Sequence, residues 1–416
     1  MHQVRILFVA VTMAMTLAFS GPAPVRAVGA TTHWVAISGT ASGTGSSCSD
    51  PGYVGDTQEP IIAALAAAQE GDTVHICAGE YVYTANGYND TLPDRITILG
   101  DGAGKTILNG DDTYYLLAID DTDGLRVSNL TLTRGSDSYG AALYLGDSHA
   151  VVSGVEFVEN SASHAGADYG GAALYVQDSS TVSVVGCRFE GNIAPGTSAG
   201  GAINIYTGVS EESHVTVTNS TFIGNRAGQG PAIYSYDDDE LDGPVSTLTL
   251  RNNVFRENEN LSSDDGGALA HEHTNADLTL VSNLFVGNSG AAYGGAAEIW
   301  DVTGAIVVER NTFRANAALE GGALWIDVSG GTRHLSRNTF ISNVAGLGGA
   351  IGQLGDDDRT GHRRAPALAA PPRSRPAGVP ARPATAAPAG SAAPSPCSGA
   401  GSSRPDRSRR VRSAGG

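Results

Sequence analysis

One aromatic slot recurs seven times along this chain and constrains its fold more than any other feature. Beyond residue 20, every phenylalanine is followed by an asparagine three residues later, and successive phenylalanines are 32, 33, 33, 30, 28 and 27 residues apart. The pairs are Phe157 and Asn160, Phe189 and Asn192, Phe222 and Asn225, Phe255 and Asn258, Phe285 and Asn288, Phe313 and Asn316, and Phe340 and Asn343. A Gly-(Gly/Pro)-Ala turn follows each pair. Such a period is typical of a solenoid of stacked coils.

One repeat unit, residues 214–236, shows what each coil contains. Residues 214–218 alternate apolar and polar side chains, which predicts a strand with Val215 and Val217 pointing inward. Residues 221–224 and 230–236 predict two more strands, each preceded by a turn. Three short strands per unit, repeated, predict an all-β fold, a parallel β-helix of about nine to ten coils spaced ~4.8 Å apart.

Stacking places equivalent residues above one another. We expect the seven phenylalanines to form a continuous aromatic stack and the seven asparagines to form a hydrogen-bonded ladder. A second inward ladder is predicted two residues before the phenylalanine, from Asn253, Asn283, Asn311 and Asn338. The slot one residue earlier holds Asn129, Gly154, Gly186, Asn219 and Asn252, which predicts a turn with positive φ. These columns are interpreted as structural, because a catalytic site does not repeat seven times.

The N-terminus reads as an export leader, residues 1–30. Arg5 precedes an apolar run, residues 6–19, that has signal-peptide length and is short for a membrane span. Cleavage after Ala27 or after Ala30 fits the small residues there. No later segment is apolar and long enough to span a bilayer. We therefore expect a secreted protein, extracellular or at the cell surface, with no membrane span in the mature chain.

Residues 31–110 are expected to cap the solenoid and start its first coils, ahead of the repeats at 111–355. Thr57 as N-cap and Pro60 in the first turn predict a short capping helix, which Gly71 would end. In an exported protein, Cys48 and Cys77 are expected to form a disulfide. Cys187 falls in an inward slot and is expected to be a buried free thiol.

The charge is uneven along the chain. The net charge is −18, yet residues 359–416 contain eleven arginines and one acid, which leaves about −28 on residues 1–358. So acidic a surface argues against nucleic acid and anionic membranes as partners. Residues 356–416 are rich in Ala, Pro and Arg, which predicts a disordered tail. We hypothesise that this tail is read out of frame; a genuine basic linker is the alternative.

Two features could form a site on one face. The loops after the third strands hold an acidic stripe, in which Asp237, Asp238, Asp239 and Glu240 are the strongest candidates for a Ca²⁺ site, since Ca²⁺ prefers oxygen ligands. The stripe also contains Asp178, Glu211, Glu212, His271, Glu272, His273, Asp301 and Asp327. A solvated charged turn is the alternative interpretation.

The same strands are predicted to point aromatic side chains outward. These side chains are Tyr206, Tyr234, Tyr236, Trp300 and Trp325. Aligned exposed aromatics bordered by carboxylates suit stacking against sugar rings. Lateral packing along the sheet is an equal alternative. Arg310 and Arg337, stacked on adjacent coils, could hold a uronate carboxylate or balance an acidic face.

The repeat also resembles known proteins. Phe-x-x-Asn together with Gly-Gly-Ala-Ile, as at residues 200–203 and 348–351, resembles the repeats of chlamydial-type polymorphic outer-membrane proteins and of secreted bacterial right-handed β-helix proteins. Residues 71–81 and 96–102 look like the start of pectin-lyase-fold chains. The resemblance covers roughly residues 55–354. The resemblance implies a right-handed parallel β-helix. For the outer-membrane group it also implies an adhesin-like role.

The function expected from the sequence is a non-enzymatic, adhesin-like or glycan-binding solenoid. Polysaccharide lyases and hydrolases of the same fold are the enzymatic alternative. They need a catalytic base with a partner charge or paired acids, and no such motif is recognised here. Residues 1–358 contain a single lysine, Lys105. Calcium is the only cofactor that the sequence suggests, and a purely structural or adhesive solenoid is a third possibility.

Overall fold

The structure is a computed structural model that describes residues 29–41, 45–162, 170–208, 210–237, 245–262, 266–290, 292–328 and 330–353. These residues all belong to one compact unit, Met1–Ala367. Most of the leader, the whole predicted tail with Cys397, and Asp238, Asp239 and Glu240 lie outside the described residues.

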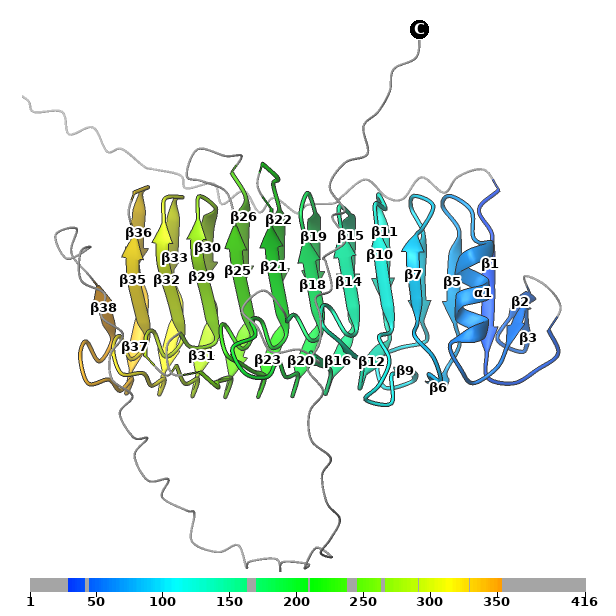
Figure 1. The fold of residues 1–416 in the computed structure, drawn as a ribbon, viewed down its shortest axis with the longest axis horizontal. Helices are drawn as coiled ribbons and strands as arrows, with labels where there is room; N and C mark the ends of the chain where they lie inside the picture. The colour runs from blue at the N-terminus through cyan, green and yellow to red at the C-terminus, as the bar shows by residue number, and fades with distance from the viewer. Residues whose placement is uncertain are drawn as a thin grey trace, which may run out of the picture. The chain divides into compact units, whose positions relative to one another are not determined.

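Three long parallel sheets run along the molecule and share its core, as the expected β-helix requires (Figure 1). The first sheet contains β4 (Tyr53–Val54), β1 (Thr32–Ala36), β5 (Thr73–Ile76), β8 (Thr97–Gly100), β11 (Leu125–Ser128), β15 (His149–Ser153), β19 (Thr181–Val185), β22 (His214–Thr218), β26 (Thr247–Arg251), β30 (Asp277–Val281), β33 (Ile306–Glu309) and β36 (Arg333–Ser336).

The second sheet carries the phenylalanines. It contains β6 (Gly79–Val82), β9 (Thr106–Asn109), β12 (Thr131–Thr133), β16 (Glu156–Val158), β20 (Arg188–Glu190), β23 (Thr221–Ile223), β27 (Val254–Arg256), β31 (Leu284–Val286), β34 (Thr312–Arg314) and β37 (Thr339–Ile341). Its ten strands agree with the expected nine to ten coils.

The third sheet follows the Gly-Gly-Ala turns. It contains β7 (Tyr88–Thr91), β10 (Leu117–Asp120), β14 (Leu143–Gly146), β18 (Leu174–Gln177), β21 (Ile203–Thr207), β25 (Ile233–Asp237), β29 (Leu269–Thr274), β32 (Ala297–Val302), β35 (Leu324–Val328) and β38 (Ile351–Gln353). Three small pairs complete the strands: β2 (Gly45–Ser47) with β3 (Asp50–Pro51), β13 (Ser136–Asp137) with β17 (Ser161–Ala162), and β24 (Arg226–Ala227) with β28 (Glu259–Asn260).

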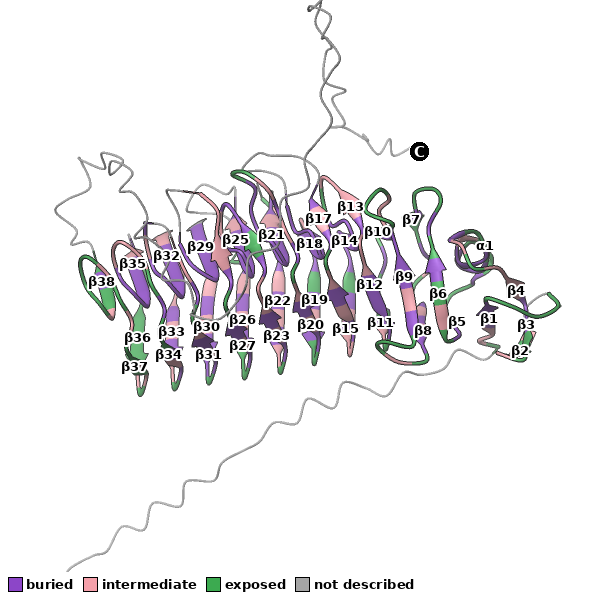
Figure 2. Cartoon of the chain, turned by 90° about the horizontal axis from the view of Figure 1, so that it is seen from below, coloured by how far each residue is buried: buried purple, intermediate pink, exposed green. Residues whose placement is uncertain are grey.

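Alternation in the sequence produces the core. In β22, Val215 and Val217 are buried while their neighbours stay partly exposed, and the same pattern recurs along the first sheet (Figure 2). The phenylalanine rings stack from coil to coil with centroid distances of 4.5 to 5.1 Å. All but Phe340 are fully buried. Each ring therefore packs against the rings above and below it, and the core is continuous through the stack.

The asparagines after the phenylalanines form a ladder with a single direction. The backbone N–H and Nδ2 of Asn192 both donate to Oδ1 of Asn225, at 3.1 and 2.9 Å, and Nδ2 also donates to the carbonyl of Phe157 at 3.0 Å. The second ladder behaves in the same way, since Asn283 donates forward to Asn311 and back to the carbonyl of Leu250. Buried amides thus satisfy backbone groups that the turns remove from the sheets.

The turns need left-handed backbone at fixed places. The slot three residues before the phenylalanine has positive φ in every coil, including Ser282, Arg310 and Arg337. In the Gly-Gly-Ala turn, Gly200 has φ +63°, and a Cβ on Gly201 would lie 2.5 Å from the carbonyl oxygens of Arg226 and Pro231. The first glycine is required for its conformation and the second for the close approach of the next coil.

The N-terminal end is covered as expected, although the helix start differs. α1 (Glu59–Ala67) begins after Gln58, not after Thr57, and no side chain caps it. The Oε1 of Gln58 instead accepts a hydrogen bond from the backbone N–H of Thr84 at 2.9 Å. The helix ends at Ala67, four residues before Gly71. Among the described residues, α1 is the only helix, and it is too short to cross a bilayer.

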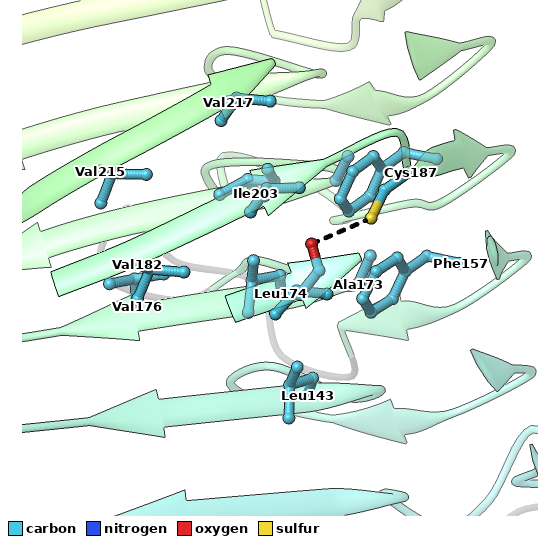
Figure 3. Close-up of a cluster of buried hydrophobic side chains, with 14 of the residues drawn as sticks. Leu143, Phe157, Ala173, Leu174, Val176, Val182, Cys187, Ile203, Val215 and Val217 are labelled. Carbon is cyan, nitrogen blue, oxygen red and sulfur yellow. Dashed lines mark hydrogen bonds between the residues drawn. The ribbon is translucent and has the colours of Figure 1, made fainter. Parts of the chain in front are cut away.

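Two cysteine predictions are confirmed. Cys48 and Cys77 form a disulfide at this capped end. Cys187 is a buried free thiol among aliphatic side chains, with its Sγ 3.5 Å from the carbonyl of Val152 (Figure 3). Burial raises the pKa of Cys187 to about 11, so the thiol stays protonated and unreactive at neutral pH.

Polar residues interrupt one inward column of the third sheet. Ser235 and His271 occupy slots that hold Ile205 and Ile299 on the flanking coils. His271 is fully buried; its Nε2 lies 3.4 Å from the carbonyl of Ala276, and its Nδ1 has no hydrogen-bond partner. Burial lowers the pKa of His271 to about 4, so the ring is neutral at pH 7.

The aromatic stack should dominate stability. Phe222→Ala removes a ring that has a stacked neighbour on each side, and we expect a loss of about 3–5 kcal/mol in the free energy of unfolding. Phe340→Ala is the matched control, because that ring is partly exposed and stacks on one described neighbour only. Urea unfolding of both variants provides the measurement. Equal losses would show that the stack does not act as a continuous core.

His271 should make the fold sensitive to acid. Its folded-state pKa lies below the ordinary value of 6.5, so the unfolded chain binds the proton more tightly. The stability is therefore complete above pH 6.5 and is lost as the pH falls towards 4, by roughly 3 kcal/mol. His271→Ile, which restores the residue type of the next two coils, should abolish this part of the loss. Identical pH profiles of unfolding for both proteins would contradict the assignment.

Candidate functional site

The outer face of the third sheet consists of two columns of side chains in register. The first outward column, beside the Gly-Gly-Ala turns, holds Tyr144, Tyr175, Asn204, Tyr234, Ala270, Glu298 and Trp325. The second outward column holds Gln177, Tyr206, Tyr236, Glu272, Trp300 and Asp327. The five aromatic residues singled out from the sequence are thus divided between two columns that differ in exposure.

The first outward column is covered by other parts of the chain. Tyr234 is 6% exposed and packs with Ala199 and Ala270, and Trp325 is 5% exposed beneath Tyr293, with a centroid distance of 4.8 Å. Both side chains point away from the core, yet segments preceding the Gly-Gly turns pack across them. The expectation that Tyr234 and Trp325 are exposed on this face is therefore wrong, because neighbouring segments cover both rings. Their contact with a ligand stays a prediction.

The second outward column is open to solvent in part. Tyr206, Tyr236 and Trp300 are each partly exposed. The rings of Tyr206 and Tyr236 lie nearly parallel, with centroids 5.9 Å apart. Glu272, between Tyr236 and Trp300 in the register, is 2% exposed. A binding role for these three aromatics stays a prediction, on a surface that can receive a ligand.

The structure adds tyrosines that the sequence reasoning missed. The rings of Tyr144 and Tyr175 stack at 5.8 Å, and Tyr139, 37% exposed, meets the edge of Tyr175 at 5.1 Å. The signal was present in the repeat, since residues 140–144 and 171–175 both read Gly-Ala-Ala-Leu-Tyr. Alignment of the Gly-Ala turns would have placed both tyrosines in the first outward column. Tyr175 is 2% exposed, so the accessible aromatics that extend the surface towards the N-terminus are Tyr139 and Tyr144.

A column of carboxylates borders these tyrosines. Asp121, Asp147 and Asp178 follow the third-sheet strands on successive coils, all with positive φ. Partial burial raises the pKa of Asp147, and the neighbouring Asp178 raises it further. Burial likewise raises the pKa of Asp178, although hydrogen bonds from Gln177 and Gly208 oppose the shift. These carboxylates therefore lie in a region of negative charge that raises the pKa of both Asp147 and Asp178.

A hydrogen-bond chain links the aromatic and acidic groups. The hydroxyl of Tyr144 donates to Oε1 of Gln177 at 2.8 Å, and Nε2 of Gln177 donates to Oδ2 of Asp178 at 2.8 Å. The backbone N–H of Gly208 donates to Oδ1 of Asp178 at 3.2 Å. Asp178 is thereby held in one orientation beside the tyrosines.

Asp237, the described member of the four residues predicted to bind Ca²⁺, lies inside the coil. Asp237 is 2% exposed and points into the core, where its Oδ2 accepts a hydrogen bond from the hydroxyl of Ser246 at 3.0 Å. It lines a cavity about one water molecule in size, together with Thr207, Ser213, Ser235, Ser246 and Thr274. Asp237 is therefore not part of a surface loop site, contrary to expectation. His271 is equally excluded from surface metal binding by its burial.

Arg310 and Arg337, the two candidate uronate ligands, form ion pairs with a neighbouring acid. Arg310 and Arg337 both lie near Oε1 of Glu309, at 3.0 and 3.5 Å, so they balance an acidic residue. Within the described residues, the one group of three side chains spaced for a metal ion is Cys48, Cys77 and Asp101. The disulfide removes both thiolates from that set.

Removing the charge of Asp147 should raise the free energy of unfolding by a measurable amount. The folded-state pKa of Asp147 lies above the ordinary 3.8, so the folded protein binds this proton more tightly, and repulsion costs stability as the pH rises above 3.8. Asp147→Asn, which tolerates positive φ, should raise the free energy of unfolding at pH 7 by up to about 1 kcal/mol and leave it unchanged at pH 3. Thermal unfolding at the two pH values tests this. A gain at both would point to packing instead of charge.

One comparison with known proteins, the family match, agrees with the fold. Residues 106–303 match the family described as "Right handed beta helix region". One solved structure that resembles the chain, "Crystal structure of pectate lyase Pel9A", is 14% identical with a TM-score of 0.41, and the alignment covers 74% of this chain and 80% of that one. At these values the likeness carries no argument about activity. No curated protein matches the sequence. The stacked parallel sheets and the family match together make the described coils a right-handed parallel β-helix.

Proposed function

We propose that this chain is an exported, non-enzymatic β-helix protein of the cell surface or extracellular space that binds polysaccharide. The observation that carries the proposal is the run of partly exposed aromatics in register on the outer face of the third sheet. Tyr206, Tyr236 and Trp300 share one column, and carboxylates border the same face. This arrangement supports an adhesin-like or glycan-binding role.

Aromatic side chains suit this ligand class for a physical reason. A sugar ring has an apolar C–H face and a polar rim, so it can stack on tyrosine or tryptophan while its hydroxyls reach carboxylates or amides. The coils repeat the same side-chain positions along the axis, as the stacked pair Tyr206 and Tyr236 shows. A linear polysaccharide lying along the axis would meet equivalent groups on successive coils.

The negative charge of the outer face of the third sheet should determine which polysaccharides bind there. Asp147 and Asp178 already repel one another, and residues 1–358 carry about −28. Polyuronates would add further negative charge to this surface. We therefore expect neutral or amino-substituted polysaccharides to bind directly, and acidic ones to bind only where Ca²⁺ bridges the two sets of carboxylates.

A specific observation keeps polysaccharide hydrolysis as the second candidate. A general acid needs a carboxyl group whose pKa is raised, and the pKa values of Asp147 and Asp178 are raised beside an aromatic surface. A lyase is less well supported, because residues 1–358 contain a single lysine and Arg310 and Arg337 are engaged by Glu309.

One incubation separates these functions. The purified protein is mixed with neutral, amino-substituted and acidic polysaccharides, with and without Ca²⁺, while retention, new reducing ends and absorbance of unsaturated products are recorded. Retention without new ends supports the binding protein. New reducing ends that disappear in Asp178→Asn would establish hydrolysis, and unsaturated products would establish a lyase. Absence of both retention and products across the panel would overturn the proposal.

The aromatic column itself is testable by substitution. Trp300→Ala and Tyr206→Ala should each weaken polysaccharide binding about threefold to tenfold, since each removes one stacking surface. Trp34→Ala is the matched control, because Trp34 lies on the first sheet, stacked on His75 at 4.3 Å. Affinity electrophoresis compares the three variants. Equal retention of all three would place the binding surface elsewhere.

A further inference from the structure

The backbone of Thr31, just before the first strand, is hydrogen-bonded to the buried carboxylate of Asp72. The backbone nitrogen of Thr31 lies 2.6 Å from Oδ1 of Asp72, which is 3% exposed. The carbonyl of Thr31 accepts a hydrogen bond from Thr73 at 2.9 Å, and β1 begins at the next residue. Gly29, by contrast, is exposed, with no atom near the position that a Cβ would take. Among the described residues, Thr31 is thus the first that hydrogen-bonds to a distant part of the chain.

Asp72 gathers donors from three directions. Besides Thr31, the backbone N–H of Gln69 donates to Oδ2 at 2.9 Å, and Nε2 of His33 lies 2.9 Å from the same oxygen. Nδ1 of His33 lies 3.3 Å from the hydroxyl of Tyr53. Burial would raise the pKa of Asp72, but the hydrogen bonds from Thr31, His33 and Gln69 outweigh it and lower the pKa. The carboxylate is therefore ionised and buried.

A buried carboxylate calls for a positive charge. His33 faces the other oxygen of this carboxylate, with its Nε2 2.9 Å from Oδ2, and the contact lowers the pKa of Asp72. The backbone N–H groups supply only dipoles. Arg95, nearby in the chain, is engaged by Glu70 at the surface. Oδ1 of Asp72 meets the backbone nitrogen of Thr31, and a cation at that position would further offset the cost of burying the carboxylate.

We propose that export processing supplies this charge, by cleavage between Ala30 and Thr31. A leader protease would add water across that peptide bond, releasing Ala30 with a carboxylate and leaving Thr31 with an α-amino group that takes up a proton. The new ammonium lies where the Thr31 nitrogen already meets Oδ1 of Asp72. It pairs with the carboxylate and fixes β1 in the first sheet. The inference rests on the leader assigned from the sequence, and not on the proposed glycan binding.

The cleavage position is tested on the full chain, expressed with its own leader in a bacterial host that exports proteins. N-terminal sequencing and intact mass of the exported protein should both give Thr31 as the first residue. A protein that begins at Val28, as cleavage after Ala27 would produce, or one that retains its leader, would overturn the proposal.

The ion pair is tested by thermal unfolding of two proteins that differ in one residue. At pH 6, a chain that begins at Thr31 should melt about 2 °C or more above one that begins at Ala30. Pairing raises the pKa of the amino group in the folded state, so the gap should be present below about pH 7.7 and close as the pH rises through that higher folded-state pKa. Acetylation of the Thr31 amine, or Asp72→Asn, should also close it. Equal melting temperatures at pH 6 would refute the pair.

Discussion

The buried asparagine amide sets the geometry on which the rest of the molecule depends. The asparagines after Phe189, Phe222, Phe255, Phe285 and Phe313 each join three coils. Nδ2 donates back to the carbonyl of an earlier phenylalanine and forward to the next asparagine, as Asn192 does between Phe157 and Asn225. These bonds hold successive turns one strand spacing apart. The phenylalanine rings must then lie parallel at about the same spacing, and the outer columns of the third sheet must stay in register. Alignment of the surface aromatics is therefore a consequence of the interior.

Repetition explains what could be predicted from the sequence and what could not. The positions of Phe222 and Asn225 recur in equivalent surroundings seven times. Their columns, the second asparagine ladder and the left-handed turn could therefore all be predicted from the sequence. The exposure of Tyr234 and Trp325 was not, because alternation tells which way a side chain points and not what lies over it. The covering residues, such as Ala199 and Tyr293, come from segments of irregular length and sequence. The start of α1 at Glu59 was also missed, since it occurs once.

One inward column of the third sheet departs from the apolar pattern of the repeat. Ser235 and His271 replace isoleucines, and Asp237 is buried nearby against Ser246. Each substitution gives up apolar burial and adds a polar group that must be satisfied inside the coil. The coil that contains Ser235 and Asp237 also carries Tyr236 on its outer face. The buried polar residues therefore lie beneath the aromatic surface. Departures from a consistent pattern tend to accompany functional or strained sites, and this one coincides with the proposed binding face.

The asparagine ladder and the aspartate column use the same stacked geometry with opposite energetic results. An amide both donates and accepts, so each asparagine stabilises the next, and the column needs no further partner. A carboxylate only accepts, so besides burial, Asp178 raises the pKa of Asp147, Glu211 and Asp120 raise the pKa of Asp178, and this repulsion costs stability at neutral pH. Each of the two has a hydrogen bond to its carboxylate, but no cation among the described contacts neutralises the pair. A hydroxyl-rich or cationic ligand would add donors or positive charge at this column, and this asymmetry gives the proposed aromatic binding face a second physical reason to take a ligand.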